Sequence, residues 1–216
     1  MKKIIITALV FIFIGCSENK VPPGTVQISD NLYIDKTEIS NFAWQEYLIW
    51  LKGEYGIDSE KYKNGLPDKK VWSSLYKTEF KLIPTNQEIR EYPIVGIDYE
   101  QAIKYCKWRT FVVNKKYEKN FNVNYRLPTK EEYISGQNIE NLKNKKKYFN
   151  PKTQLYKLPD KIKGKHTIFL STNVSEMTNE KGKAYGANFS DTSNLIKDYS
   201  DAEIWLGFRC VAQIVE

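Results

Sequence analysis

Trp205-Leu206-Gly207-Phe208-Arg209-Cys210-Val211 is the segment of this 216-residue chain that says most about its architecture. Its mainly apolar side chains predict a terminal β-strand. A glycine inside a strand pattern indicates the close approach of another backbone, so we expect Gly207 to pack against a neighbouring segment. Cys210 is one of three cysteines in the chain, and this strand therefore carries one end of a long-range cross-link if one forms.

Upstream, two capping patterns and one apolar stripe predict helices. Asp98 with Gln101 opens a helix over 99–112, and Thr129 with Glu132 opens a short helix. A third helix begins near residue 41, where Gln45 and Glu46 are expected to face away from the core. Its buried stripe consists of Trp44, Tyr47, Leu48 and Leu51.

The other segments predict short strands and long loops. Apolar alternation around Ser29-Asp30-Asn31 predicts a hairpin, and residues 93–97 and 168–170 predict short strands. Residues 52–91 show no sustained period, which predicts an irregular excursion held by aromatic residues such as Trp72. Three short helices, short strands and long loops together predict a single α+β domain.

The first 24 residues have the pattern of a bacterial lipoprotein leader and tether. Two lysines precede an apolar run from Ile4 to Ile14. As a helix this run would be about 16 Å long, which is too short for a hydrocarbon core of about 30 Å. Cys16 follows Gly15, so we expect residues 1–15 to be a signal peptide and Cys16 to be acylated.

Residues 16–24 would then form a lipidated tether, stiffened by Pro22-Pro23-Gly24, and the folded domain would occupy residues 25–216. The alternative for the apolar run is a buried N-terminal strand or a short anchor helix. Ser17 stands where an aspartate usually retains a lipoprotein in the inner membrane. We therefore expect an outer-membrane location, on the periplasmic or the cell-surface face, with the membrane as a partner through the acyl chains on Cys16.

The charge balance excludes a strongly basic nucleic-acid reader. Without the leader's two lysines the 33 basic residues fall to 31 against 26 acidic ones, a net charge of +5. The excess lies between Lys143 and Lys165 and includes Lys145-Lys146-Lys147. Nucleic acid, anionic lipid or an acidic glycan could meet such a run, but a solvated loop is favoured. Export also argues against nucleic acid as a partner.

With Cys16 acylated, Cys106 and Cys210 remain as an even pair in a compartment where thiols are normally oxidised. Lys104 and Lys107 lie on another face of the predicted helix, so Cys106 is expected to point inward. These features predict a disulfide between Cys106 and Cys210. The alternative is two separate buried thiols.

Six segments in this order resemble the formylglycine-generating enzymes, also called the sulfatase-modifying-factor family, over about residues 25–214. They are Asp35-Lys36-Thr37-Glu38-Ile39-Ser40-Asn41; Tyr92-Pro93-Ile94-Val95-Gly96-Ile97; Ala102-Ile103-Lys104-Tyr105-Cys106-Lys107-Trp108; Arg126-Leu127-Pro128-Thr129; Asn173-Val174-Ser175-Glu176-Met177; and Gly207-Phe208-Arg209-Cys210. The resemblance implies an α+β fold with little regular secondary structure. It also implies the predicted disulfide, because some members join the corresponding cysteines.

Within that family the chain is most similar to the gliding-motility and type IX secretion lipoproteins of Bacteroidetes. Besides the lipoprotein leader, the segments that carry this narrower resemblance are Leu66-Pro67-Asp68-Lys69-Lys70-Val71-Trp72, Cys106-Lys107-Trp108-Arg109-Thr110 with Val113-Asn114 following, and Ser171-Thr172-Asn173-Val174-Ser175-Glu176. The resemblance implies envelope proteins of a secretion or motility complex as partners.

The family's oxidase chemistry is not expected in this chain. The enzymes of the family bind copper(I) through two cysteines near the C-terminus, and the corresponding stretch, residues 182–194, contains no cysteine. Relatives that bind non-haem iron use several histidines, whereas this chain has only His166. We therefore assign no catalytic residue and expect no redox cofactor. A nucleophile pair of Cys106 and His166 would require a free, accessible Cys106.

Some acidic and amide side chains are candidates for structural roles. Oxygen ligands for calcium could come from Asn188, Asp191, Asp198 and Asp201, with Asn194 and Glu203 nearby, although loop capping is the alternative. Glu38 and Glu176 resemble framework positions of the family. We expect both carboxylates to accept hydrogen bonds from backbone amides and assign neither a catalytic role.

Together these observations predict a non-catalytic outer-membrane lipoprotein, a structural or interaction component of an envelope assembly such as the gliding and type IX secretion apparatus. Residues 52–91 and 143–165 are the expected contact surfaces. The alternative is a diverged oxidase or another oxygen-dependent enzyme. A third hypothesis, suggested by the aromatic content of 14%, is a surface module that binds glycans.

Overall fold

The structure is a computed structural model that describes residues 21–80, 89–118, 122–138, 149–151, 154–159 and 173–215. Within these residues it combines helices with short strands, as the α+β prediction requires. Several predicted features lie outside the described residues: the leader, the acylation site Cys16, the strand at 168–170, His166 and the lysine run at 145–147.

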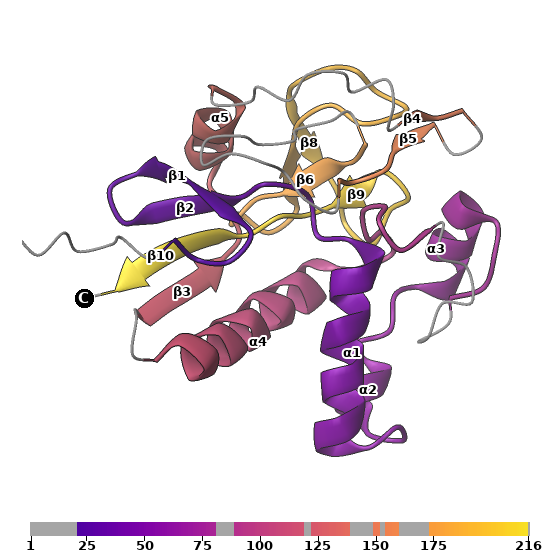
Figure 1. Cartoon of the computed structure of the whole chain (residues 1–216). Coiled ribbons are helices and arrows are strands. Elements are labelled where there is room, and N and C mark those ends of the chain that lie inside the picture. The colour runs from indigo at the N-terminus through magenta and orange to yellow at the C-terminus, as the bar shows by residue number, and fades with distance from the viewer. Residues whose placement is uncertain are drawn as a thin grey trace, which may run out of the picture.

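A four-stranded antiparallel sheet with the order β1-β2-β10-β3 forms one side of the molecule (Figure 1). The predicted hairpin is confirmed as β1 (Thr25–Ser29) and β2 (Leu32–Asp35), with Asn31 in the left-handed conformation at the turn. The C-terminal strand β10 (Val211–Val215) lies between β2 and β3 (Asn122–Arg126). The last strand therefore joins the N-terminal hairpin to the middle of the chain.

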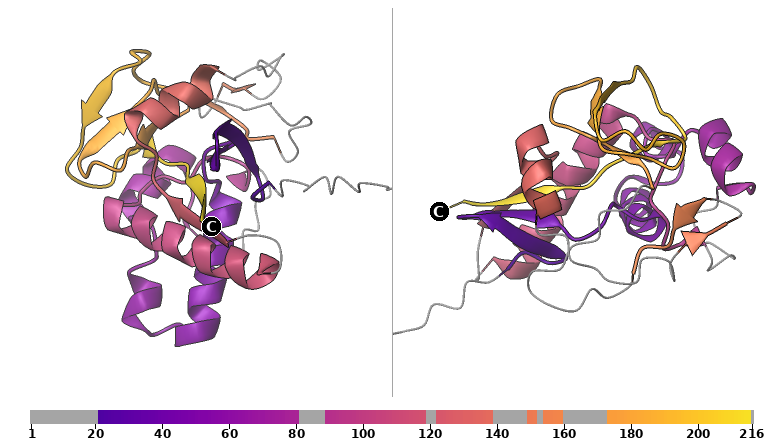
Figure 2. Two further views of the ribbon diagram at one scale, coloured as in Figure 1. Left: turned by 90° about the vertical axis from the view of Figure 1, so that its left-hand side faces the viewer. Right: turned by 90° about the horizontal axis from the view of Figure 1, so that it is seen from above.

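Two helices cover opposite faces of this sheet (Figures 1 and 2). Helix α4 (Tyr99–Tyr117) packs on β3, and α5 (Lys130–Asn138) contacts β1 and β2. Because both faces are covered, β2 does not alternate: its last three residues are all buried. Beneath α5 lies a small apolar cluster of Val26, Ile34, Tyr133, Tyr185 and Val211.

A second sheet has the strand order β8-β7-β6-β9. It contributes Met177, Ala184 and Leu206 to the main hydrophobic core of the molecule. It consists of β6 (Ser175–Met177), β7 (Lys183–Tyr185), β8 (Ile196–Asp198) and β9 (Leu206–Gly207). The ladder is antiparallel except where β9 runs parallel to β6. A separate two-stranded ladder joins β4 (Phe149–Asn150) to β5 (Leu155–Tyr156).

The prediction of one continuous terminal strand is wrong, because residues 205–211 divide between the two sheets. The backbone between β9 and β10 bonds to the last residue of β2 and to the segment that follows β2. Ile39 N–H donates to the carbonyl of Phe208, and Asp35 N–H donates to that of Cys210, both over 2.9 Å. The expected close approach at Gly207 is confirmed, since a Cβ there would lie 2.7 Å from a methyl of Val174.

Helix α1 (Asn41–Tyr55) is capped by Ser40, whose hydroxyl accepts a hydrogen bond from Ala43 N–H over 3.1 Å. The predicted stripe is confirmed as buried, but Gln45 is buried as well, contrary to prediction. Helix α1 and the short α2 (Glu60–Lys63) project from the rest of the molecule (Figures 1 and 2).

The prediction that residues 52–91 are irregular is wrong in part, because they contain α2 and α3 (Lys69–Tyr76). Both are too short to show a helical period, and each depends on an N-cap, Ser59 or Asp68. Trp72 is buried as predicted, and its indole N–H donates to the side chain of Asn41 over 3.0 Å.

Residues 93–97 do not form the predicted strand. Only Pro93 makes a bridge, to Ser40, and Gly96 turns the chain with a φ of +75°. Both predicted capping boxes are confirmed, but α4 runs five residues past its predicted end. The side chain of Asn114 exchanges two 2.9 Å hydrogen bonds with the backbone of Val123, which ties the last turns of α4 to β3. The described residues thus hold five helices in place of the predicted three.

Candidate functional site

The family-like segments converge on a buried ionic cluster centred on Arg209. Its guanidinium donates to both carboxylate oxygens of Glu176, over 2.6 and 2.8 Å, and to the carbonyl of Asp35 over 2.9 Å. The carboxylate of Glu38 lies 3.6 Å away. Burial alone would lower the pKa of Arg209, but the two carboxylates raise it above its ordinary value. The guanidinium therefore stays charged.

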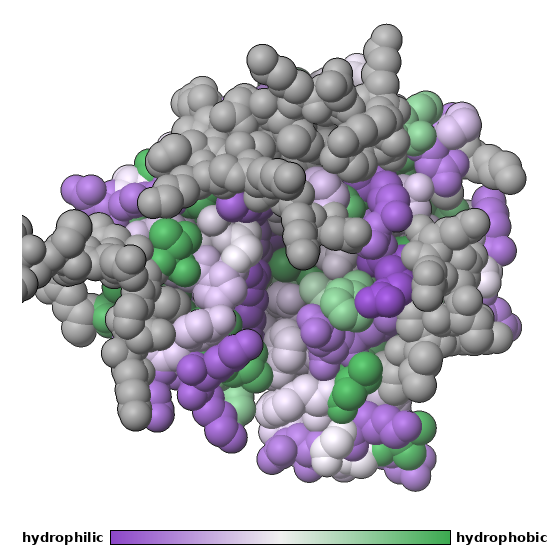
Figure 3. Space-filling view, viewed as in Figure 1, coloured by the Kyte–Doolittle hydropathy of each residue, from purple (hydrophilic) through white to green (hydrophobic). Residues whose placement is uncertain are grey.

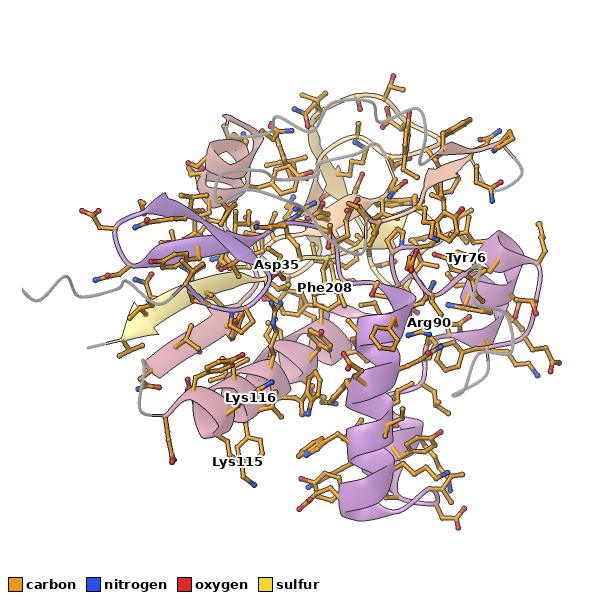
Figure 4. The ribbon with its side chains drawn as sticks, in the orientation of Figure 1. Asp35, Tyr76, Arg90, Lys115, Lys116 and Phe208 are labelled. Carbon is orange, nitrogen blue, oxygen red and sulfur yellow. The ribbon has the colours of Figure 1, made fainter. Side chains whose placement is uncertain are left out.

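A second buried pair stands beside this cluster. The carboxylate of Asp35, at the end of β2, accepts hydrogen bonds from Arg109 over 2.6 Å and from Cys210 N–H over 2.9 Å. Arg109 also donates to the carbonyl of Pro23 over 3.0 Å and lies over the ring of Tyr125. Figure 4 places Asp35 near Phe208 at the centre of the molecule.

The pair of Arg209 and Glu176 is placed to hold the fold and does not line the adjacent cavity. Arg209, Glu176 and Glu38 are each 0–1% exposed. A cavity of about 270 Å³ is lined by Asp35, Glu38 and Arg109, and the surface is hollowed near the centre of this face (Figure 3). Arg209 and Glu176 are not among its lining residues. A catalytic group must contact the reacting molecule, and this pair is sealed from it.

The expected roles of Glu38 and Glu176 need one correction. Glu176 accepts from side chains, namely Arg209 and the hydroxyl of Tyr133 at 3.5 Å, and not from backbone amides. Burial and the nearby Glu176 charge raise the pKa of Tyr133 well above its ordinary value, so the hydroxyl keeps its proton. Glu38 lies within the same cluster.

The sulfur atoms of Cys106 and Cys210 lie 3.3 Å apart, and both residues are buried. A disulfide would need about 2.05 Å, so the structure holds two thiols in contact, and the bond stays a prediction. The expectation that Cys106 points inward from α4 is confirmed.

The residues present do not fit the family's copper(I) site. Thiolates are the ligands that copper(I) prefers, yet burial, together with the contact with Cys106, raises the pKa of Cys210 well above its ordinary value. Residues 182–194 supply no sulfur and form β7 and a turn. Nowhere in the described ranges do three or more His, Cys, Asp or Glu side chains gather as a metal site would require.

The calcium candidates form turns and surface pairs. The side-chain oxygen of Asn188 accepts from the N–H groups of Ser190 and Asp191 over 2.9 and 2.8 Å. Asp191 in turn accepts from Ser193 N–H over 2.8 Å, and Asp198 pairs with Lys183 over 2.6 Å. The side chain of Asp201 accepts from the next N–H, that of Ala202. The structure thus brings together Asn188 and Asp191 only, in one Asx turn.

A different feature is open to solvent, an aromatic groove between α1, α2 and α4 with a volume of about 580 Å³. Its aromatic lining consists of Tyr47, Trp50, Tyr55, Trp108 and Phe111. Their rings contact one another with centroids 5.2–6.4 Å apart. Phe111 is 52% exposed and Tyr55 40%. We call this feature the aromatic groove.

Sequence reasoning missed the groove and the roles of Arg109 and Arg209. The groove combines residues from three helices, one of which was not predicted. The arginines carried a usable signal: the chain has only four, and three of them pair with carboxylates. Rare arginines among many lysines indicate positions where a planar, bidentate donor is needed.

Within the part of the chain that the structure describes, no helix has the length and apolar character needed to cross a bilayer.

The comparisons with known proteins point to one family. The model of the sulfatase-modifying factor enzyme 1-like domain matches residues 7–155. No curated protein matches the chain. A solved structure titled "Crystal Structure of CarF" is 14% identical, and the alignment covers 86% of this chain and 87% of that chain with a TM-score of 0.46. Because the family model matches more than half of its residues, the chain belongs to the sulfatase-modifying factor enzyme 1-like family.

Proposed function

We propose that this chain is a non-catalytic, acylated outer-membrane lipoprotein that uses its fold as a rigid platform for contacts with other envelope proteins. One observation carries the proposal: the side chains of the family-like segments bond to one another inside the molecule. The contacts of Arg209 with Glu176, of Arg109 with Asp35 and between the two thiols hold four distant segments of the chain together. A fold whose signature residues are structural exerts its function through its surface.

The assembly that we propose for this chain is the gliding-motility and type IX secretion apparatus. Two segments behind that resemblance have structural roles in this chain. Asp68 caps α3 and Trp72 fills the core beneath it, while Arg109 donates to the carbonyl of Pro23, at the end of the predicted tether. Members that share these residues would share the platform, and they would differ in the surfaces that meet their partners.

Membrane attachment is tested by fractionation of cells that express the full chain. We expect Cys16→Ser to move the protein from the membrane to the soluble fraction, because acyl chains are its only proposed anchor. The matched variant Ser17→Asp keeps the cysteine and is expected to shift the protein to the inner membrane. If Cys16→Ser stays with the outer membrane as the wild type does, the anchor is misassigned.

Partner contact is tested by chemical cross-linking in the native envelope, with the wild-type protein as bait and mass spectrometry of the adducts. We expect one or a few specific envelope proteins to be captured, through peptides near the described surface of α1, α2 or α3. Recovery of the chain alone, under conditions that cross-link a known envelope complex, would contradict the proposal.

A further inference from the structure

We propose that the aromatic groove binds an oligosaccharide, with pyranose rings packed on its aromatic side chains. The inference goes beyond the platform function and does not depend on it. The site lies between α1, α2 and α4, away from the buried ionic cluster. Its occupant is identified by two properties of the lining: flat apolar faces, and charged groups of both signs that are free to bond to hydroxyls.

The aromatic side chains form one contacting cluster, in which neighbouring rings are inclined by 45–87° to one another. Trp50 lies at its centre, with ring centroids 5.8 Å from Tyr55, 6.1 Å from Phe111 and 6.4 Å from Trp108. Trp108 in turn contacts the buried Tyr47 with ring centroids 5.2 Å apart, which joins the cluster to the core. Such rings bind with little loss of side-chain entropy because their neighbours already fix them. The C–H faces of a pyranose ring are flat and apolar, so each can stack on the face of one aromatic ring, and the inclined rings would receive successive sugar units.

The rim carries both donors and acceptors. Lys104 and Lys107 come from α4, while Glu54 and Glu60 come from α1 and α2. None of these four forms an ion pair within 4.0 Å with any residue in the described ranges. Lys61, also on the rim, lies 3.8 Å from the centre of the Tyr55 ring. Sugar hydroxyls both donate and accept, so they can satisfy ammonium and carboxylate groups together.

This mixture of charges distinguishes a sugar from a protein segment. An acidic peptide would gain from the lysines but would meet Glu54 and Glu60 as like charges in the same groove. A purely apolar helix would leave all five charged groups to be desolvated without partners. The volume of about 580 Å³ also lies within the range of roughly 300 to 1,000 Å³ that sites for small ligands occupy.

The groove contains two of the five tryptophans, so intrinsic fluorescence reports on it directly. The test titrates the folded protein with chitotriose, cellotriose and maltotriose at millimolar concentrations. We expect saturable quenching or a spectral shift with at least one of them. Phe111→Ser should weaken that binding by about tenfold, the equivalent of about 1.4 kcal/mol. The paired substitution Lys104→Ala with Lys107→Ala should weaken it as well.

Two matched variants keep the test independent of folding. Phe42→Ser removes an exposed aromatic from the same helix α1, where Arg90 lies over it and no groove residue does. Lys116→Ala removes a lysine of α4 that is not part of the lining. Both should bind as the wild type does. The proposal is overturned if no trisaccharide binds, if Phe42→Ser weakens binding as much as Phe111→Ser, or if only an acidic peptide binds.

Discussion

Arg209 is the single residue on which the interior depends most. It is 0% exposed and joins the second sheet, through Glu176, to the end of β2. Replacement by methionine preserves much of its volume but leaves Glu176 and Glu38 as buried carboxylates without their cation. We expect Arg209→Met to cost about 3–5 kcal/mol of unfolding free energy, measured by urea denaturation.

The double variant Arg209→Met with Glu176→Gln is the control for this change. It removes one of the stranded charges, so it should be more stable than Arg209→Met alone. A loss below about 1 kcal/mol in the single variant would show that the cluster does not hold the fold.

The contribution of Glu132 to the free energy of unfolding is expected to depend on pH. Burial alone would raise its pKa, but hydrogen bonds from Arg126 and Thr129 N–H, together with the Arg126 charge, lower it below the ordinary value. A carboxyl with a lowered pKa stabilises the fold above its ordinary pKa of about 4.3, and this contribution is lost as the pH falls through the lower folded-state value.

Glu132→Gln keeps one acceptor oxygen for the cap but removes the charge and the second oxygen that accepts from Arg126. We expect it to be about 1 kcal/mol less stable than the wild type at neutral pH. The difference should shrink toward zero in acid, as followed by urea unfolding at several pH values. A difference that is constant from neutral to acidic pH would rule out the charged pair as its cause.

Hydrogen bonds of individual side chains could be predicted where the two partners are close in the sequence. Both capping boxes could be read because cap and partner lie three residues apart. The Arg209 contacts could not, since they join residues 33 and 174 positions apart. A single sequence offers no local pattern that pairs such groups.

Among the strands and helices, two glycines distinguish the effect of close packing on stability from the effect of helix propensity. A Cβ on Gly207 of β9 would meet a methyl of Val174 at 2.7 Å and the carbonyl of Ile94 at 3.1 Å. We expect Gly207→Ala to destabilise the protein by about 1–3 kcal/mol, because a sheet edge and a loop must move apart. Thermal unfolding followed by circular dichroism measures this change.

Gly53 within α1 is the matched control, because no atom lies within 4 Å of the Cβ position there. Gly53→Ala should raise stability by about 0.5–1 kcal/mol through helix propensity and reduced backbone entropy. If both alanines have the same effect, the close approach at Gly207 is not a constraint.

Elements with a clear period or cap were predicted, and the others were not. The hairpin, α1, α4 and α5 satisfy a local rule over several residues. Residues 205–211 were wrongly predicted as one strand because their apolar pattern is continuous. Their backbone bonds go to Asp35 and Ile39 rather than to one ladder. Helices α2 and α3 were missed because four and eight residues show no period.

At the scale of the whole molecule, the contact between Cys106 and Cys210 links α4 to the segment before β10. If the chain is exported as we propose, these thiols lie in an oxidising compartment, and we expect them to be joined. Closing a loop of about a hundred residues would contribute roughly 4–5 kcal/mol in the chain-entropy model. Alkylation and mass measurement of protein from the envelope, with and without reductant, will show it. Two alkylated cysteines without reductant would contradict the bond.

The chain keeps the family fold, and we propose that its buried arginines and carboxylates have structural roles and that the family's oxidase chemistry has been lost. The most direct test incubates the purified protein with copper(I), oxygen and a sulfatase peptide that contains the target cysteine, and follows the peptide by mass spectrometry. We expect the peptide to be unchanged and the copper to be removed by desalting. Conversion of the cysteine to an aldehyde by protein that retains stoichiometric copper would contradict the proposal.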